Sequence, residues 1–148
     1  MIIIAYYLFY LYTSVYSDPS TLLSGEKIKN SEDLKSGNGN YRLSMQDDGN
    51  LALYTKEGKA LWASDSAGKG SLPYTLFMQP DMNLVVYDQS NTAVWNIDVY
   101  IGKGGDWTAG GHAKLQDDGN FVVYDGSNKV MWESGTSGGT KSAKWKTT

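Results

Sequence analysis

The sequence contains no cysteine, and this absence excludes several kinds of chemistry. None of its 148 residues can form a disulfide, act as a thiol nucleophile or bind zinc through a thiolate. Clusters of basic residues are also missing, since 13 Lys and Arg stand against 16 Asp and Glu, for a net charge of -3. A nucleic-acid-binding surface needs a basic patch, so the composition argues against a nucleic-acid partner.

The first 17 residues, "MIIIAYYLFYLYTSVYS", have no charged side chain and form the longest apolar run. Spanning a bilayer takes about 20 apolar residues, so we expect no membrane insertion. The run resembles the apolar region of a signal peptide, with Val15 and Ser17 near the cleavage site, although basic residues are missing at its start. A hydrophobic first strand is the alternative. We predict a signal peptide over residues 1–17 and a secreted protein.

The rest of the chain indicates an all-β fold. Short segments of alternating apolar and polar residues are separated by Gly, Asn, Asp and Ser, and no long amphipathic helix pattern is present. The length suits one domain with a core of its own.

A short motif occurs three times: "MQDDGNLALY" (45–54), "MQPDMNLVVYD" (78–88) and "LQDDGNFVVYD" (115–125). The copies start 33 and 37 residues apart, and a Trp follows the Gln of each copy after sixteen residues, at Trp62, Trp95 and Trp132. Periods of this size indicate an internal repeat. The three parts run from about Ser20 to Asp65, Ser66 to Asp98 and Val99 to Ser134. Each is too small to bury its own apolar face, so we expect them to pack around a shared axis with the three Trp side chains in the core.

Alternation along each motif predicts one apolar face and one solvent-facing row of Gln, Asp, Asn and Tyr. These side chains mix donors and acceptors, as recognition of neighbouring sugar hydroxyls requires. Val85 and Val122 lie within the row and offer a small apolar patch to the ring of a sugar. Such an arrangement requires no metal and no cofactor.

The pattern Gln-x-Asp-x-Asn-x-Val-x-Tyr resembles the signature of the monocot mannose-binding lectins, also called bulb-type or lily-type lectins. "LLSGEKI" (22–28) also resembles the start of the bulb-type lectin domain. The resemblance implies a β-prism II fold, in which three four-stranded antiparallel sheets surround a pseudo-threefold axis. It also implies mannose binding without calcium, at one shallow site per sheet. The bulb-type lectin domain would cover residues 18–134, followed by a C-terminal tail over 135–148.

The resemblance also implies the residues that bind carbohydrate. Asp and Asn would meet the 2-hydroxyl of mannose, Gln the 3-hydroxyl and Tyr the 4-hydroxyl, while Val packs on the ring. The first site departs from the pattern, with Ala52 in place of Val. The implied residues are Gln46, Asp48, Asn50 and Tyr54 in the first site, Gln79, Asp81, Asn83, Val85 and Tyr87 in the second, and Gln116, Asp118, Asn120, Val122 and Tyr124 in the third.

Two other functions are compatible with parts of the sequence. An enzyme would need positioned acid and base groups, but the only His, His112, lies outside the repeated motifs, and the carboxylates of adjacent pairs such as Asp47 and Asp48 diverge in extended chain. We therefore expect no catalysis. The stronger alternative is a protein of the same fold that has lost sugar binding and acts in protein–protein contact.

The family resemblance further implies a homodimer in which the C-terminal strand of each chain completes a sheet of its partner. The segment 129–135 would be that strand, because an unpaired edge strand is a template for pairing. The tail through Trp145 would either cover a sheet edge or lie free.

Overall fold

The structure is a computed structural model that describes residues 18–99, 105 and 110–143. The expected signal peptide, Trp107 and Trp145 lie outside these residues. The described chain contains twelve β-strands and one 3-10 turn, Ser137–Gly139. Within these ranges no helix is long and apolar enough to cross a membrane.

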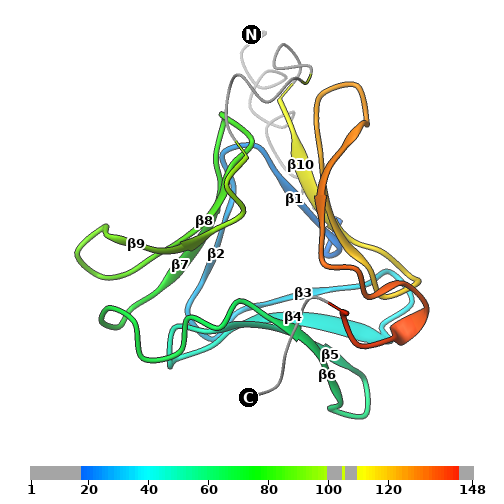
Figure 1. The fold of residues 1–148 in the computed structure, drawn as a ribbon, viewed down its shortest axis with the longest axis horizontal. Helices are drawn as coiled ribbons and strands as arrows, with labels where there is room; N and C mark the ends of the chain where they lie inside the picture. Colours follow the sequence, from blue (N-terminus) through cyan, green and yellow to red (C-terminus); the bar gives the residue numbers. More distant parts are fainter. Residues whose placement is uncertain (1–17, 100–104, 106–109, 144–148) are drawn as a thin grey trace, which may run out of the picture.

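The strands form three four-stranded antiparallel sheets, which make the three sides of a triangle in Figure 1. The first sheet has the order β3 (Asp33–Lys35), β4 (Tyr41–Met45), β5 (Leu51–Thr55) and β6 (Ala60–Ala63). The second has the order β2 (Lys27–Lys29), β7 (Thr75–Met78), β8 (Leu84–Tyr87) and β9 (Ala93–Asn96). The third has the order β1 (Thr21–Leu23), β10 (His112–Leu115), β11 (Phe121–Tyr124) and β12 (Val130–Glu133). The predicted all-β architecture of three sheets is confirmed.

Each sheet contains three consecutive strands (β4–β6, β7–β9 or β10–β12), and its fourth strand comes from the start of the described chain. Residues 21–35 give β1 to the third sheet, β2 to the second and β3 to the first. One short segment therefore crosses all three sides of the triangle and ties the repeats together. The sequence pattern assigns this segment to the first repeat and does not reveal its distribution over three sheets, because strand partners far apart in sequence leave no local periodicity.

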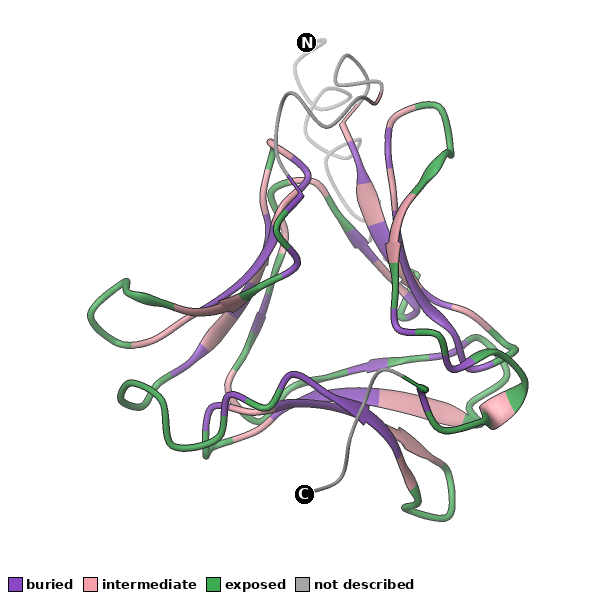
Figure 2. Cartoon of the chain, viewed as in Figure 1, coloured by how far each residue is buried: buried purple, intermediate pink, exposed green. Residues whose placement is uncertain are grey.

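The core lies between the sheets, and its side chains come from the apolar positions of the repeats. Leu53, Val86 and Val123 occupy equivalent positions in β5, β8 and β11, and all three are fully buried. Figure 2 shows buried residues along the strands and exposed residues in the outer turns. Burial of these aliphatic side chains provides the main driving force for closing the prism.

The three repeated Trp side chains meet one another, as the repeat predicts. Their ring centroids lie 5.5 Å apart for Trp62 and Trp95, 5.6 Å for Trp62 and Trp132, and 6.2 Å for Trp95 and Trp132, all in edge-to-face geometry. Aromatic pairs favour this geometry because the positive edge of one ring faces the negative face of the other. Trp62 is buried, but Trp95 and Trp132 are only half-buried against the core. The prediction of three equal core positions therefore holds in full for Trp62 alone.

The sheets also interlock through their turns in a cyclic pattern. A Cβ atom at Gly49, in the turn of the first sheet, would lie 2.7 Å from the ring of Tyr74, which precedes the second sheet's β7. Gly119 stands in the same relation to Tyr41 of the first sheet, at 2.6 Å. Both glycines have positive φ, at +90° and +87°, so they serve both the turn and the close approach.

At the third contact the sizes of the two residues are reversed: the large residue lies in the turn, and the glycine lies next to β10 of the neighbouring sheet. Met82 replaces the turn glycine of the second sheet, keeps a positive φ of 66° and is fully buried. Gly111 takes the place of the aromatic residue, and a Cβ there would lie 2.8 Å from the Cγ of Met82 and 2.6 Å from the backbone oxygen of Tyr124. The Met82 side chain thus fills the space that a Tyr fills at the other two contacts. This packing offsets the strain of a left-handed Met.

The C-terminal residues of the described chain lie against two sheets. β12 pairs with β11 of the same chain. After it, the Gly139 amide donates to the Asp118 carbonyl (3.2 Å), and the Ser142 amide donates to the Leu61 carbonyl in β6 (3.0 Å). Residues 135–143 thus contact both the third and the first sheet, while the tail from residue 144 through Trp145 lies outside the described residues, so its role stays a prediction. Exchange of β12 between two chains stays a prediction.

Candidate functional site

The three rows occupy equivalent places on the three sheets. In each, Gln directly follows the end of one strand, Asp and Asn lie in the tight turn, and Tyr is in the next strand. The turn closes through the same two backbone bonds each time, as where the Gln46 amide donates to the Asn50 carbonyl (3.0 Å) and the Gly49 amide donates to the Gln46 carbonyl (3.1 Å). The structure therefore brings the residues of each predicted site together.

Gln and Tyr of each row are joined by a side-chain hydrogen bond. The amide nitrogen of Gln46 donates to the Tyr54 hydroxyl (2.7 Å), and Gln116 donates in the same way to Tyr124. In the second row the Tyr87 hydroxyl donates to Oε1 of Gln79 (2.9 Å). Each pair is half-buried. The bond fixes two polar groups side by side at the edge of the site and leaves further donors and acceptors of both groups for a ligand.

The Asp of each row holds the backbone of the turn. One carboxylate oxygen accepts the amide proton of the Asn two residues later, at 2.9 Å for Asp48, Asp81 and Asp118 alike. This local bond is the usual one for Asp in turns. In the second row the other carboxylate oxygen, Oδ2 of Asp81, accepts a long bond of 3.4 Å from the amide nitrogen of Gln79.

The Asn side chains correct one expectation from the sequence, because they do not simply face solvent. Asn120 is 6% exposed, and its Oδ1 accepts from the Ser134 hydroxyl (3.1 Å) and from the backbone amides of Gly135 and Thr136 (both 3.1 Å). Asn50 binds Ser64 and Ser66 in the same manner. The Asn oxygen thus fastens the segment that follows the last strand of the sheet, and its amide nitrogen takes no part in this contact.

The second row lacks this fastening. Ile97 and Val99 stand where the other two sheets have a hydroxyl residue, and both are buried. The Oδ1 atom of Asn83 is buried and has no hydrogen-bond partner in the described part of the chain. Its amide nitrogen makes one long bond, of 3.4 Å, to Oδ1 of Asn96. The repeat spacing of 33 residues places Ile97 and Val99 at the positions of Ser64 and Ser66, so the sequence already contains this difference.

The small apolar residues of the rows lie in the floor of the sites. Ala52, Val85 and Val122 expose only 2%, 3% and 2% of their surface. Strand alternation predicts that they face outward, yet their neighbours cover most of each side chain. A sugar ring therefore gains little apolar contact from them.

The third row is the most strongly engaged with its own chain. The amide nitrogen of Asn120 donates to Oε2 of Glu133 (2.7 Å), and the second carboxylate oxygen of Asp118 accepts from the Ser137 hydroxyl (2.7 Å). In the first row, Ala63 occupies the position of Glu133 opposite Ala52. The three sites therefore share one framework and differ in how many polar groups stay open to a ligand.

A second set of neighbours, missed in the sequence analysis, stands beside each Tyr. Arg42 lies over the Tyr54 ring at 4.5 Å, and His112 stacks on Tyr124 at 5.0 Å, whereas Thr75 is the residue opposite Tyr87. Burial, with a smaller effect from the Lys114 charge, lowers the pKa of His112 below its usual range. All three neighbours precede their Tyr by twelve residues, so aligning the three repeats would have identified them as equivalent positions.

In the ranges that the structure describes, no three His, Asp or Glu side chains gather into a possible metal site.

Solved structures resemble this chain over most of its length. A monomeric monocot mannose-binding lectin from Gastrodia elata is 36% identical, with a TM-score of 0.69, over 80% of this chain and 98% of the lectin. A Marasmius oreades lectin is 31% identical, with a TM-score of 0.68, over 80% and 92%. The mannose-specific agglutinin from snowdrop, Galanthus nivalis, solved with methyl-α-D-mannoside, is 36% identical, with a TM-score of 0.61, over 71% and 88%. No family model and no curated protein matches the chain.

Three sheets with one repeated polar row each, together with these likenesses, define a carbohydrate-binding lectin of the β-prism II fold. The chain belongs to the family of monocot mannose-binding lectins. This family is one of non-enzymatic lectins, which agrees with the expectation that the chain does not catalyse a reaction.

Proposed function

We propose that the chain binds mannose or mannose-rich glycans through its three rows, without a metal ion. The single observation that supports this most directly is the equivalent pairing of Gln with Tyr in all three rows. A turn alone requires neither residue. The snowdrop and Polygonatum cyrtonema relatives were solved with mannosides, and a tarin lectin was solved with trimannose.

Each site offers a few neutral hydrogen bonds, worth about 1 kcal/mol each against water. The floor residues are covered, so apolar contact adds little. We expect one mannose to bind with a dissociation constant of about 1 mM, and useful avidity to come from several sites on one branched glycan.

Retention on mannan-agarose with release by free mannose tests the proposal. The decisive variant combines Tyr54→Phe, Tyr87→Phe and Tyr124→Phe, which removes three hydroxyls and keeps the rings. Tyr41→Phe is the control, because Tyr41 lies outside the rows. We expect the control to be retained and the triple variant to be lost. A folded wild-type chain that is not retained would instead favour the alternative, a protein of this fold that acts in protein–protein contact.

We also propose a homodimer formed by exchange of β12. The strand lies at the edge of the third sheet, and Val130 within it is 49% exposed. Light scattering tests this assembly, and a chain that runs as a monomer rules it out. The Gastrodia elata relatives are monomeric, so a monomer is the alternative to this dimer.

The remaining part of the proposal is secretion through a signal peptide over residues 1–17, which rests on the sequence pattern alone. Mass spectrometry of protein collected from the medium tests it. A mass that starts after Ser17 supports cleavage, and an intact Met1 contradicts it.

A further inference from the structure

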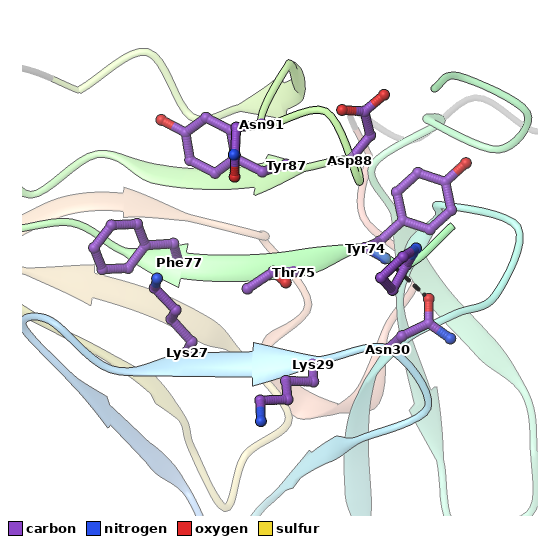
Figure 3. Close-up of a pocket in the computed structure, with 10 residues that line it drawn as sticks. Lys27, Lys29, Asn30, Tyr74, Thr75, Phe77, Tyr87, Asp88 and Asn91 are labelled. Carbon is purple, nitrogen blue, oxygen red and sulfur yellow. Dashed lines mark hydrogen bonds between the residues drawn. The ribbon is translucent and has the colours of Figure 1, made fainter. Parts of the chain in front are cut away.

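A groove opens on the outer face of the second sheet beside its polar row. It encloses about 650 Å³ and lies between β2, β7 and β8. Figure 3 shows Lys27 and Lys29 along one wall, Phe77 and Thr75 in the middle, and Tyr87 and Asp88 along the opposite wall. Tyr87 belongs to both the groove and the predicted second site, so the two are continuous.

The groove exists because of the residue opposite Tyr87. In the first and third sheets, Arg42 and His112 lie against the Tyr ring at this position. In the second sheet the same position is Thr75, whose side chain is too short to cover the ring. The flank of Tyr87 is therefore open to a ligand.

The charge of the groove is positive. Lys27 and Lys29 are exposed, and neither forms an ion pair within the described residues. Asp88 is the carboxylate on the other wall, but it faces its own loop, where Oδ1 accepts from the amides of Ser90 (2.9 Å) and Thr92 (3.0 Å). The loop thus holds this carboxylate, and the two ammonium groups stay available to an anion.

Phe77 adds an aromatic surface at the boundary between groove and site. It pairs across the strands with Val85 of the row, and the ammonium group of Lys27 lies 4.6 Å from its ring centroid. Ser44 and Lys114 occupy its position in the other sheets. A half-buried ring can pack against the C–H face of a sugar, while its cation–π contact holds Lys27 in place.

We propose that this groove is a subsite for an acidic group carried by the sugar next to the mannose in the second site. The occupant is a mannose-containing glycan with a carboxylate or a phosphate on the neighbouring residue. Lys27 and Lys29 bind the anion, Phe77 packs against the ring, and Tyr87 links the subsite to the mannose. The inference rests on the proposed mannose binding.

Two matched pairs of disaccharides test the subsite and separate the two sources of charge. Mannosyl-glucuronic acid is compared with mannosyl-glucose, and mannobiose phosphorylated on its reducing residue is compared with mannobiose. Titrations are followed by two-dimensional NMR, in which the amides of Thr75 and Tyr87 report on the second site and those of Arg42 and His112 on the others. We expect at least one acidic ligand to bind the second site about threefold to tenfold more tightly than its neutral partner, as two exposed charge contacts allow.

The double variant Lys27→Gln with Lys29→Gln should lose this preference and keep its affinity for the neutral ligand. The variant Lys56→Gln with Lys59→Gln is the matched control, because it removes the same charge from the exposed β5–β6 turn. The preference should also fall as salt is raised. Equal binding of acidic and neutral ligands at the second site, or a preference that survives in the Lys27 and Lys29 variant, overturns the subsite and leaves the mannose proposal intact. Failure of every ligand, neutral ones included, overturns both.

Discussion

The second sheet differs from the first and third in three places, although all three follow the same repeat. Its turn carries Met82 where the others carry Gly, its Asn83 oxygen lacks the hydroxyl partners of Asn50 and Asn120, and its Tyr87 flank is open. In each case the backbone and the strand register stay the same. The prism therefore tolerates changed side chains as long as a neighbour compensates for the change in volume.

In the second sheet, the changed residues compensate for one another in volume, but they do not replace the lost hydrogen bonds. Met82 and Gly111 exchange volume across the sheet boundary, so the space stays filled. Ile97 and Val99 keep the second sheet apolar and leave Oδ1 of Asn83 without a hydrogen-bond partner among the described residues. We infer that apolar burial dominates the stability of the second sheet, whereas hydroxyl networks contribute more in the other two.

The largest expected effect contrasts the Trp side chains of the first and second sheets. Trp62→Ala should lower the free energy of unfolding by about 3–5 kcal/mol, because it opens a cavity at a buried site. Trp95→Ala should cost clearly less, since Trp95 is half-buried. Urea unfolding measures both. Equal losses would mean that Trp95 contributes as much to packing as Trp62, although part of its side chain is exposed.

Replacement of Met82 by Ala tests whether its side chain fills the space at Gly111. We expect a loss of about 2–5 kcal/mol in unfolding free energy, because truncating this fully buried side chain leaves a cavity. Met82→Leu is the control, which keeps most of the volume and should cost less than about 1.5 kcal/mol. A loss below about 1 kcal/mol for Met82→Ala would mean that the neighbouring sheet closes over the space.

The two Asn side chains should respond differently to the same truncation. Asn120→Ala leaves buried donors of Ser134 and Thr136 without an acceptor, so we expect a loss of about 1–3 kcal/mol in unfolding free energy. Asn83→Ala should cost less than about 1 kcal/mol, because its oxygen has no partner to lose in the described chain. Thermal or urea unfolding compares them. Equal costs would contradict a structural role for the Asn oxygen.

The smallest expected effect is on the pH dependence of stability, through His112, the residue that stacks on Tyr124. Burial lowers the pKa of His112 below the ordinary 6.5, so the unfolded chain takes up its proton at a higher pH than the folded one. The stability contributed by neutral His112 is thus fully present above pH 6.5 and is lost as the pH falls through the folded pKa. In His112→Thr, which copies Thr75 of the second sheet, this loss should disappear.

Unfolding free energies of wild type and His112→Thr at pH 7.5 and pH 5 measure the difference. The wild type should lose more stability than the variant on acidification. A smaller loss in the wild type would mean that His112 gains a favourable partner when it is protonated.

Local chemistry was sufficient to predict the repeat, the all-β class and the place of the three rows. Gln46, Asp48 and Tyr54 recur with their turn, and a period of two assigns Leu51 and Leu53 to the interior. The same rule failed for Val85 and Asn120, which it assigns to the solvent face. Both are covered by residues from the neighbouring strand and the following segment, and alternation along one strand says nothing about its neighbours.

The sequence by itself therefore determined the fold class, the three polar rows and the Trp positions, because each depends on spacing within one repeat. Only the tertiary structure decided which strands meet. Lys27 lies beside Phe77, fifty residues later, because β2 pairs with β7, and the groove follows from that pairing. The strands of residues 21–35 are three residues long each. Strands this short carry too little pattern to specify a partner, so the packing of the complete prism selects it.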